Sequence, residues 1–448
     1  MSTENETWSS RLGFIFAAVG SAVGLGNIWS FPFQTAANGG AAFLVVYLLA
    51  VVIIGFPAML VEFVIGRRSE RSAVTAFAEL GHGDWSIAGK LGVLTSFVTL
   101  AFYSVVGGWV LSYVVGSVTG AYFGDAAGYF GAVASGPVAI GAHAVFMALT
   151  VAIVAGGVAG GIERATTFMI PAILVLLVGL AAWGATLSGA GAGYGYYLTP
   201  DVGALLSNVA TIVPAAVGQA FFTLSLGFSV MIAYSSYLGR DDSLPADGGA
   251  IVLVNTLVAL LAGFVVFPIL FSLGIEPGTG GMGAAFISLA GAFGQLPGGT
   301  VIGFGFFTVL LFAALSSSIS LLEVPVGYVV ENYDYARSRV GLGVGGLVFL
   351  IGLPSAMGTD VLGWYNAVVF NFLLPLVVFL LVVFVGWVAT AQAADELHRG
   401  SSLGDSFTAA WLWWVRLVIP VAVALTFVLG AQDLLVKAGV LDSAVVLG

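Results

Sequence analysis

The chain has 448 residues, of which 60% are hydrophobic and only 8% are charged, and its mean hydropathy is +1.09. These values exclude a water-soluble domain and indicate a polytopic membrane protein. The formal net charge is −10, no cysteine is present, and the three histidines are scattered. A disulfide framework and a cysteine or histidine metal site are therefore not expected.

Apolar segments of about 20 residues are long enough to cross ~30 Å of hydrocarbon. A further apolar stretch, 281–296, is short and flanked by Gly and Pro, which favours a helical hairpin in an external loop. We expect an all-α polytopic membrane protein with eleven transmembrane helices at residues 12–35, 41–66, 89–119, 137–157, 165–187, 207–237, 249–275, 299–331, 340–356, 361–390 and 405–434.

The basic residues favour one orientation in the membrane. If the N-terminus is cytoplasmic, ten of the twelve Lys and Arg residues lie at the inner face, and only Arg416 and Lys437 do not. The positive-inside rule requires such a bias. The polar, acidic start of the chain lacks the basic region of a signal peptide. We expect a multi-pass protein of the plasma (cell) membrane, in contact with lipid, with a cytoplasmic N-terminus and an extracellular C-terminus.

Two of the expected helices contain helix-breaking residues. Residues 20–33, in helix 1, read GSAVGLGNIWSFPF, and residues 218–229, in helix 6, read GQAFFTLSLGFS. A bilayer tolerates a broken helix only where protein or a water-filled cavity satisfies the freed backbone groups. Helix 6 comes five helices after helix 1, and because five is odd the second set of five helices is inverted relative to the first. A 5+5 inverted repeat with a site near the midplane is therefore predicted. Small residues that merely allow close helix packing are the simpler alternative.

This organisation divides the chain into five segments. They are a cytoplasmic N-terminal segment at 1–10, a first five-helix repeat at 11–187, an extracellular loop at 188–206, a second, inverted repeat at 207–390, and helix 11 with a short extracellular tail at 391–448.

Several long motifs resemble the neurotransmitter:sodium symporter family. The resemblance begins with RLGFIFAAVGSAVGLGNIWSFPF at 11–33 and continues through FYSVVGGW, GQAFFTLSLGF, FAALSSSISLLEV and NFLLPL, in that order. It covers nearly the whole chain, and eleven helices resemble a prokaryotic branch of the family. It implies a sodium-coupled symporter that imports a small neutral amino acid by alternating access, and not an enzyme. A carrier of an osmolyte or other zwitterion such as taurine or betaine is the alternative, and a channel is less favoured.

The resemblance also implies two sodium sites built from oxygen atoms, which suit a hard cation. An isolated asparagine in an apolar helix is otherwise more often an interhelical hydrogen bond. Site one maps to Ala22, Asn27, Thr223 and Asn255. Site two maps to the carbonyls of Gly20, Val23 and Ala313 and the hydroxyls of Ser316 and Ser317.

The implied substrate pocket combines backbone N–H groups, hydroxyls and apolar side chains. The positive end of the half-helix after the break favours a carboxylate, and hydroxyls and freed carbonyls favour an ammonium group. Gly24 stands where amine transporters of the family carry an aspartate, so an amino acid is expected, with an aliphatic side chain because Phe228 restricts the volume. The pocket maps to Ser21, Ala22, Gly24, Leu25, Gly26, Thr99, Tyr103, Phe222, Ser225, Phe228, Ser317 and Leu321.

The sequence departs from the family at both gates. Ser30 and Asn366 stand where an arginine and an aspartate form the extracellular gate, and we expect them to face each other above the pocket. At the cytoplasmic gate Trp8 and Glu331 are kept, whereas Asn5 replaces the arginine.

Other properties stay open or are not expected. Ala259 holds the position that separates chloride-dependent from chloride-independent relatives, and an anion site would be lined by Tyr47, Gln219 and Thr223, so chloride use is undecided. HExxH, GxSxG and phosphate-loop motifs are absent, which argues against an enzyme. No nucleic-acid partner is expected, and the sequence leaves the oligomeric state and the ion stoichiometry open.

Overall fold

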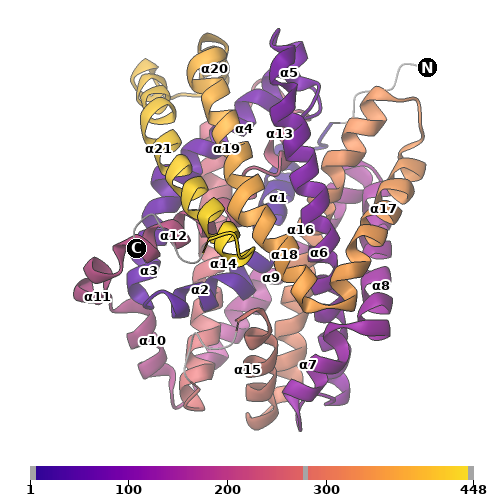
Figure 1. Ribbon diagram of the computed structural model, residues 1–448, viewed down its shortest axis with the longest axis vertical. Helices are drawn as coiled ribbons and strands as arrows, with labels where there is room; N and C mark the ends of the chain where they lie inside the picture. Colours follow the sequence, from indigo (N-terminus) through magenta and orange to yellow (C-terminus); the bar gives the residue numbers. More distant parts are fainter. Residues whose placement is uncertain (1–6, 276–280, 442–448) are drawn as a thin grey trace.

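A computed structural model of the chain describes residues 7–275 and 281–441 (Figure 1). Over these residues the chain forms helices and connecting segments, without a β-strand. The helices pack side by side in an elongated bundle, with α5 and α20 at one end and α7, α10 and α15 at the other (Figure 1). We call the first of these the arginine-rich end, because Arg67, Arg71 and Arg399 flank the elements there.

The elements up to the middle of the chain are α1 (Arg11–Ala22), η1 (Gly26–Ser30), α2 (Phe31–Ala37), α3 (Ala41–Ala50), η2 (Val51–Gly55), α4 (Phe56–Ser69), α5 (Ala76–Glu79), η3 (Gly83–Trp85), α6 (Ser86–Thr119), α7 (Ala126–Ala134), α8 (Gly136–Ala155), η4 (Val158–Glu163) and α9 (Arg164–Gly184). The remaining elements are α10 (Ala190–Leu198), α11 (Val202–Ser207), α12 (Val209–Thr223), α13 (Val230–Ser235), α14 (Leu244–Ser272), α15 (Gly281–Gln295), α16 (Gly299–Asn332), α17 (Arg337–Met357), α18 (Thr359–Val368), η5 (Val369–Leu373), α19 (Leu374–Val383), η6 (Phe384–Val388), α20 (Thr390–His398) and α21 (Asp405–Lys437).

The described residues contain nine helices long and apolar enough to cross a membrane, and the bent pair Arg11–Ala22 and Gly26–Ala37 makes up a tenth span. The other expected span, 207–237, consists of the shorter helices α12 and α13 with irregular backbone between them. The expected loop at 188–206 contains the short helix α10 and most of α11.

Helix packing places α1 at the centre. On one side α6 packs against α8, α16 and α17, and on the other α4 packs against α13 and α14. The first helix, α1, contacts α9, α14 and α16, so its broken end lies between the two packed groups. Irregular backbone in α1 is therefore surrounded by protein, as the membrane requires.

The stretch 281–296 forms one helix, α15, so the expected helical hairpin is wrong. This helix packs against α7, α14 and α16. Its Phe286 and Phe293 are each only 1% exposed, and the Phe286 ring contacts the rings of Trp109 and Phe130. A single uninterrupted helix buries both phenylalanines, which a reversal of the chain between them would separate.

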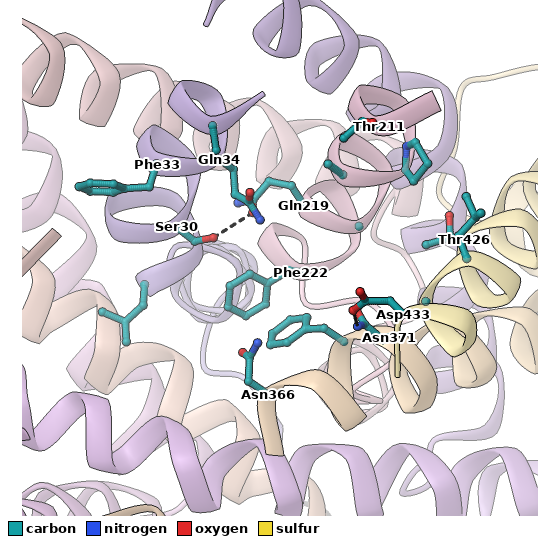
Figure 2. Close-up of a pocket in the computed structure, with 18 of the residues that line it drawn as sticks. Ser30, Phe33, Gln34, Thr211, Gln219, Phe222, Asn366, Asn371, Thr426 and Asp433 are labelled. Atoms are coloured by element: carbon teal, nitrogen blue, oxygen red, sulfur yellow. Dashed lines mark hydrogen bonds between the residues drawn. The ribbon is translucent and has the colours of Figure 1, made fainter. Parts of the chain in front are cut away.

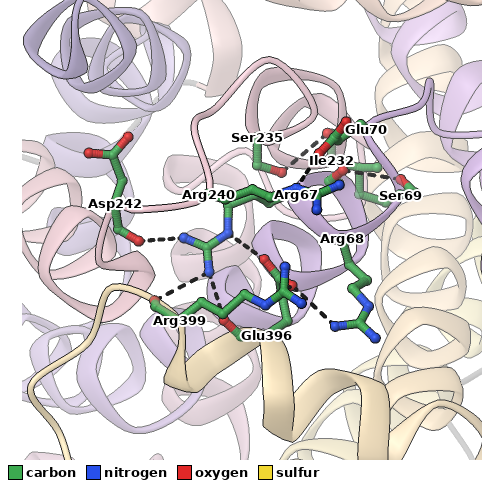
Figure 3. Close-up of polar contacts among 11 residues, drawn as sticks. Arg67, Arg68, Ser69, Glu70, Ile232, Ser235, Arg240, Asp242, Glu396 and Arg399 are labelled. Atoms are coloured by element: carbon green, nitrogen blue, oxygen red, sulfur yellow. Dashed lines mark hydrogen bonds and ion pairs between the residues drawn. The ribbon is translucent and has the colours of Figure 1, made fainter.

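Buried charge holds the arginine-rich end together (Figure 3). Arg67 at the end of α4 and Glu396 of α20 form an ion pair at 2.6 Å, and both side chains are almost fully buried. Arg67 also donates to the carbonyl oxygens of Asp242 and Glu396. Nearby, at the exposed surface, Arg240 pairs with Glu70 at 2.7 Å, and this hydrogen bond raises the pKa of Arg240 above its usual value. These contacts tie α4, the segment after α13, and α20 into one unit.

Candidate functional site

The first helix is interrupted between Ala22 and Gly26, and its two halves meet at an angle of 48°. Val23 has extended backbone dihedrals, which end α1. Side chains hold the freed N–H groups: Gly24 donates to Asn27 Oδ1 at 3.2 Å, and Leu25 donates to the Tyr103 hydroxyl at 3.2 Å. The break therefore presents polar backbone inside a buried environment.

The second break lies between α12 and α13. Ser225, Gly227 and Ser229 have positive φ angles of 54°, 81° and 58°, which only glycine adopts without strain. Two contacts hold this backbone: Glu62 Oε1 accepts from the Gly227 N–H at 2.8 Å, and Ser225 Oγ donates to the Ser21 carbonyl at 2.8 Å. The second contact places the two breaks side by side.

Four serine hydroxyls meet where the breaks touch α16. Ser21 Oγ donates to Ser225 Oγ at 3.0 Å, Ser320 Oγ donates to Ser21 Oγ at 2.8 Å, and Ser317 Oγ donates to the Ser21 carbonyl at 3.0 Å. All four residues are buried. Sequence reasoning missed Ser320, although its position three residues after Ser317 puts it on the same face of a helix.

The residues mapped to sodium site one lie together. Asn27 Nδ2 donates to Asn255 Oδ1 at 2.8 Å, and the Thr223 hydroxyl lies 3.2 Å from the Asn255 amide nitrogen. In the alternative orientation of its amide, which gives up the bond from Asn27, the Asn255 nitrogen donates to the carbonyl oxygens of Thr223 at 3.0 Å and Ala22 at 3.1 Å. In either orientation the end of the Asn255 side chain lies beside these two carbonyl oxygens, and oxygen atoms of this kind suit a hard monovalent cation.

The residues mapped to sodium site two lie together with one exception. Ser316 Oγ is 3.1 Å from the Ala313 carbonyl and 3.4 Å from the Val23 carbonyl. A Cβ on Gly20 would lie 3.3 Å from Ser316 Cβ, so the end of α1 packs closely on α16 here. The exception is Ser317, whose hydroxyl donates to the Ser21 carbonyl, next to the break in helix 1.

A cavity of about 880 Å³ (Figure 2) lies beside the break in helix 1 and is bounded by α2, α12, α18 and α21. Leu25, Tyr103 and Phe222 of the expected substrate pocket line it. The other expected pocket residues are buried and do not line the cavity: Ser21, Ala22, Gly24, Gly26, Thr99, Ser225, Phe228, Ser317 and Leu321.

The expected contact between Ser30 and Asn366 is not formed in the described part of the chain. Both residues line the cavity, on opposite sides of Phe222 (Figure 2). The Ser30 hydroxyl donates to Gln219 Oε1 at 3.2 Å, while Gln219 Nε2 donates to the Gly26 carbonyl at 2.8 Å. The Ser30 side chain is too short to reach Asn366 across the cavity, whereas the longer Gln219 side chain lies within hydrogen-bonding distance of the Ser30 hydroxyl. From the sequence, Gln219 is an isolated amide in an apolar run, and only the undecided anion site points to it.

A second cavity, of about 670 Å³, lies at the arginine-rich end and is lined by Trp8 and Glu331. Trp8 Nε1 donates to the Tyr234 carbonyl at 2.9 Å. Glu331 lies 3.6 Å from the Arg71 guanidinium, which places a cation beside this carboxylate from a different segment than the one expected. Asn5, at the expected gate position, lies outside the described residues.

The start of α1 is held by Glu163, which sequence reasoning missed. Its carboxylate accepts from the Ser9 N–H at 2.9 Å, the Ser9 hydroxyl at 2.5 Å and the Ser10 hydroxyl at 3.1 Å. A Cβ at Gly13 would lie 1.9 Å from Glu163 Oε1, so a larger residue there would have to displace this carboxylate. These contacts join the N-terminal segment to the start of the fifth span at η4.

The profile of the Sodium:neurotransmitter symporter family matches residues 5–124 and 134–438. The chain is 37% identical to the sodium-dependent transporter YhdH of Bacillus subtilis, over 94% of this chain and 96% of that protein. It is 32% identical to the sodium-dependent transporter MJ1319 of Methanocaldococcus jannaschii, over 96% and 92%.

A solved structure shows the same fold. The crystal structure of MhsT in complex with L-phenylalanine superposes with a TM-score of 0.86 at 39% sequence identity, covering 94% of this chain and 99% of that one. The sequence matches extend over both broken helices and both groups of oxygen atoms. The resemblance in the sequence is thus confirmed: the chain is a membrane protein that belongs to the sodium:neurotransmitter symporter family of sodium-dependent transporters.

Proposed function

We propose that this symporter couples two sodium ions to the import of a small neutral amino acid by alternating access. The observation that carries the proposal is the break in helix 1, where backbone N–H groups lie between two groups of oxygen atoms. Asn27 belongs to one group, and Ser316 with the Val23 carbonyl belongs to the other. Such a site takes an anionic group and cations next to each other.

The lack of a side chain at Gly24 supports a substrate that brings its own carboxylate. A Cβ there would lie 2.4 Å from Ser317 Oγ, so an acid at this position would have to displace that hydroxyl. The Ser21 and Ser225 hydroxyls retain acceptor lone pairs, which suit an ammonium group. An α-amino acid supplies both groups, and MhsT, the structural neighbour, binds L-phenylalanine.

Taurine or betaine is the alternative substrate class. Taurine retains an ammonium group, whereas betaine has no N–H donor for the serine hydroxyls. A channel is less favoured, because the two cavities share no lining residue and buried serines such as Ser21 and Ser320 lie at the breaks that separate them.

The proposed orientation places the arginine-rich end in the cytoplasm and the C-terminus outside, as the positive-inside rule favours. The cavity above Phe222 then faces the exterior, and the cavity beside Trp8 faces the cytoplasm. In two inverted five-helix halves, the broken span of α12 and α13 would match the broken span of α1 and α2. This symmetry would bring the two breaks together as observed. Exchange between outward-open and inward-open forms then carries substrate past the breaks.

Uptake into liposomes tests the proposal. Purified protein should accumulate neutral amino acids only with an inward sodium gradient, and a panel of the twenty amino acids, taurine and betaine identifies the class. Replacement of chloride by gluconate decides the chloride requirement, which Ala259 leaves open. Equal uptake with potassium or choline in place of sodium would show that the coupling is wrong.

A further inference from the structure

Arg416 places a positive charge inside the last membrane span. Between Asp405 and Asp433 it is the only charged residue of α21. In the described part of the chain its side chain forms no ion pair with a carboxylate, and it lines neither of the two cavities. A charged side chain within a span is costly, and it normally pairs with a counter-charge or faces a water-filled cavity. The charge of Arg416 therefore calls for an anion from outside the protein.

The backbone of helix 10 holds the guanidinium group in place. Arg416 Nε donates to the Gly386 carbonyl at 2.6 Å, and Arg416 Nη2 donates to the Thr390 hydroxyl at 3.2 Å. Gly386 belongs to η6, and a Cβ there would lie 3.3 Å from Arg416 Cγ, so the stem of the arginine packs closely on this backbone. Because a guanidinium has five N–H donors, these two bonds leave three donors for a ligand.

Two exposed tryptophans neighbour this guanidinium. Trp387 directly follows Gly386 and is 52% exposed, whereas Trp413 lies three residues before Arg416 on the same face of α21 and is 63% exposed. Arg416 itself is partly exposed. Tryptophan is enriched at the membrane–water interface, where its apolar ring and its N–H donor are both accommodated. The three side chains thus indicate a surface at the level of the lipid headgroups.

The position of Arg416 along α21 agrees with this level. The helix begins at the arginine-rich end (Figure 1) and has 33 residues, which is about 50 Å, whereas the hydrocarbon layer is ~30 Å thick. If the surplus length is shared equally by both ends, Arg416, about three helical turns after Asp405, lies ~6 Å inside the hydrocarbon. Helical side chains lean toward the helix N-terminus, and a long arginine reaches the headgroups from this depth.

We propose that Arg416, with Trp387 and Trp413, binds the phosphate group of an anionic phospholipid in the leaflet at the arginine-rich end. A guanidinium donates two parallel N–H bonds to phosphate oxygens, and the net negative charge of the lipid neutralises Arg416. The acyl chains then extend along Leu417 and Val421, which are exposed further along α21. The site is independent of the transported substrate, and only its assignment to the cytoplasmic leaflet rests on the proposed orientation.

Native mass spectrometry of the full-length, delipidated protein tests the site by titration with phosphatidylglycerol. Arg416→Gln removes the charge, and Arg164→Gln is the matched control, because Arg164 is an exposed arginine at the start of α9, on a different span. We expect Arg416→Gln to raise the dissociation constant of the first bound phosphatidylglycerol about tenfold or more, since hydrogen bonds to a charged group are lost. Arg164→Gln should change it by less than about twofold.

Further arms identify the ligand and keep the test independent of one variant. Phosphatidylcholine, whose choline cation cancels the phosphate charge, should bind the parent more weakly than phosphatidylglycerol. An excess of inorganic phosphate should not displace phosphatidylglycerol, because the acyl chains add apolar contact. Arg416→Lys keeps the charge without the planar fork, so its affinity should lie between those of the parent and Arg416→Gln. Melting followed by circular dichroism shows that each variant is folded.

Each contrary result has a distinct meaning. Equal affinity for phosphatidylglycerol in the parent, Arg416→Gln and Arg164→Gln overturns the site, and so does an affinity of Arg416→Lys no higher than that of Arg416→Gln. Equal binding of the two lipids by the parent overturns the requirement for an anionic lipid. Displacement by inorganic phosphate shows that a free anion is the ligand and overturns the lipid assignment. Because the titration contains neither sodium nor substrate, none of these results bears on the proposed transport.

Discussion

Substitution of Gly24 tests the proposed substrate site most directly. A Cβ at this position would lie 2.4 Å from Ser317 Oγ and 3.1 Å from the Tyr103 hydroxyl oxygen. Both groups are held in place, since Ser317 donates to the Ser21 carbonyl at 3.0 Å and Tyr103 accepts from the Leu25 N–H at 3.2 Å. Gly24→Ala must therefore displace Ser317 and break its bond.

The expected size of the effect follows from this overlap. Adding a methyl group to a packed interior costs about 1 to 3 kcal/mol, which is about a 5-fold to 150-fold loss of substrate affinity if the bound form carries the cost. Gly24→Asp adds a carboxylate beside the N–H groups proposed to bind the carboxylate of the substrate, and repulsion in a closed site costs several kcal/mol more. Gly24→Asn has the same shape without the charge and isolates the electrostatic part.

Thermal stabilisation of each variant by amino acids in sodium measures these affinities. We expect the order parent, Gly24→Ala, Gly24→Asn, Gly24→Asp, from strongest to weakest binding. Combining Gly24→Ala with Ser317→Ala should recover part of the loss, because the clashing hydroxyl is removed. Binding by Gly24→Asp as tight as that of the parent would refute the assignment of this pocket. Strict additivity in the double variant would refute the contact with Ser317.

Three further predictions concern the ion pair, the sodium site and the gate. Glu396→Gln leaves Arg67 buried without its charged partner and should cost about 3 to 5 kcal/mol of stability; adding Arg67→Met should restore part of the melting temperature in detergent, and no recovery would contradict the pairing. Asn255→Leu should raise the sodium concentration for half-maximal uptake about tenfold or more, measured by a sodium titration, and an unchanged value would remove Asn255 from site one. Ser30→Arg with Asn366→Asp should be tolerated better than either single change and should slow substrate release at low salt, because the longer, oppositely charged side chains can reach each other across the cavity. Off-rates without coupling between the two positions would show that even these longer side chains do not pair.

Much of the fold could be predicted from the distribution of apolar residues. Long apolar runs predict spans because the bilayer requires internally bonded helices, and Gly, Asn and Pro inside such a run predict a break for the same reason. The stretch 281–296 shows where this reasoning stops. Its composition and flanks are equally compatible with a hairpin, and what decides is the burial of Phe286 against Trp109, a contact between residues far apart in the sequence.

The sequence likewise predicts only part of the candidate site. Local sequence predicts that Gly24 and Asn27 lie in an interrupted helix, but it does not reveal that Asn27 reaches Asn255, which is 228 positions away. Family resemblance supplied that grouping. It could not supply Ser30 with Gln219, since this chain lacks the family's gate charges and the replacement partner depends on side-chain length.

Asn27 connects the proposed substrate and sodium sites through one side chain. Its oxygen accepts from the Gly24 N–H at 3.2 Å, and its nitrogen donates to Asn255 at 2.8 Å. When the Asn27 oxygen turns to a cation at site one, the Gly24 N–H loses its acceptor and needs another. A substrate carboxylate is the acceptor that fits there, because Gly24 has no side chain to block it. In the proposed function, this amide makes carboxylate binding stronger when sodium is present and, by linkage, sodium binding stronger when substrate is present, which is the coupling that a symporter requires.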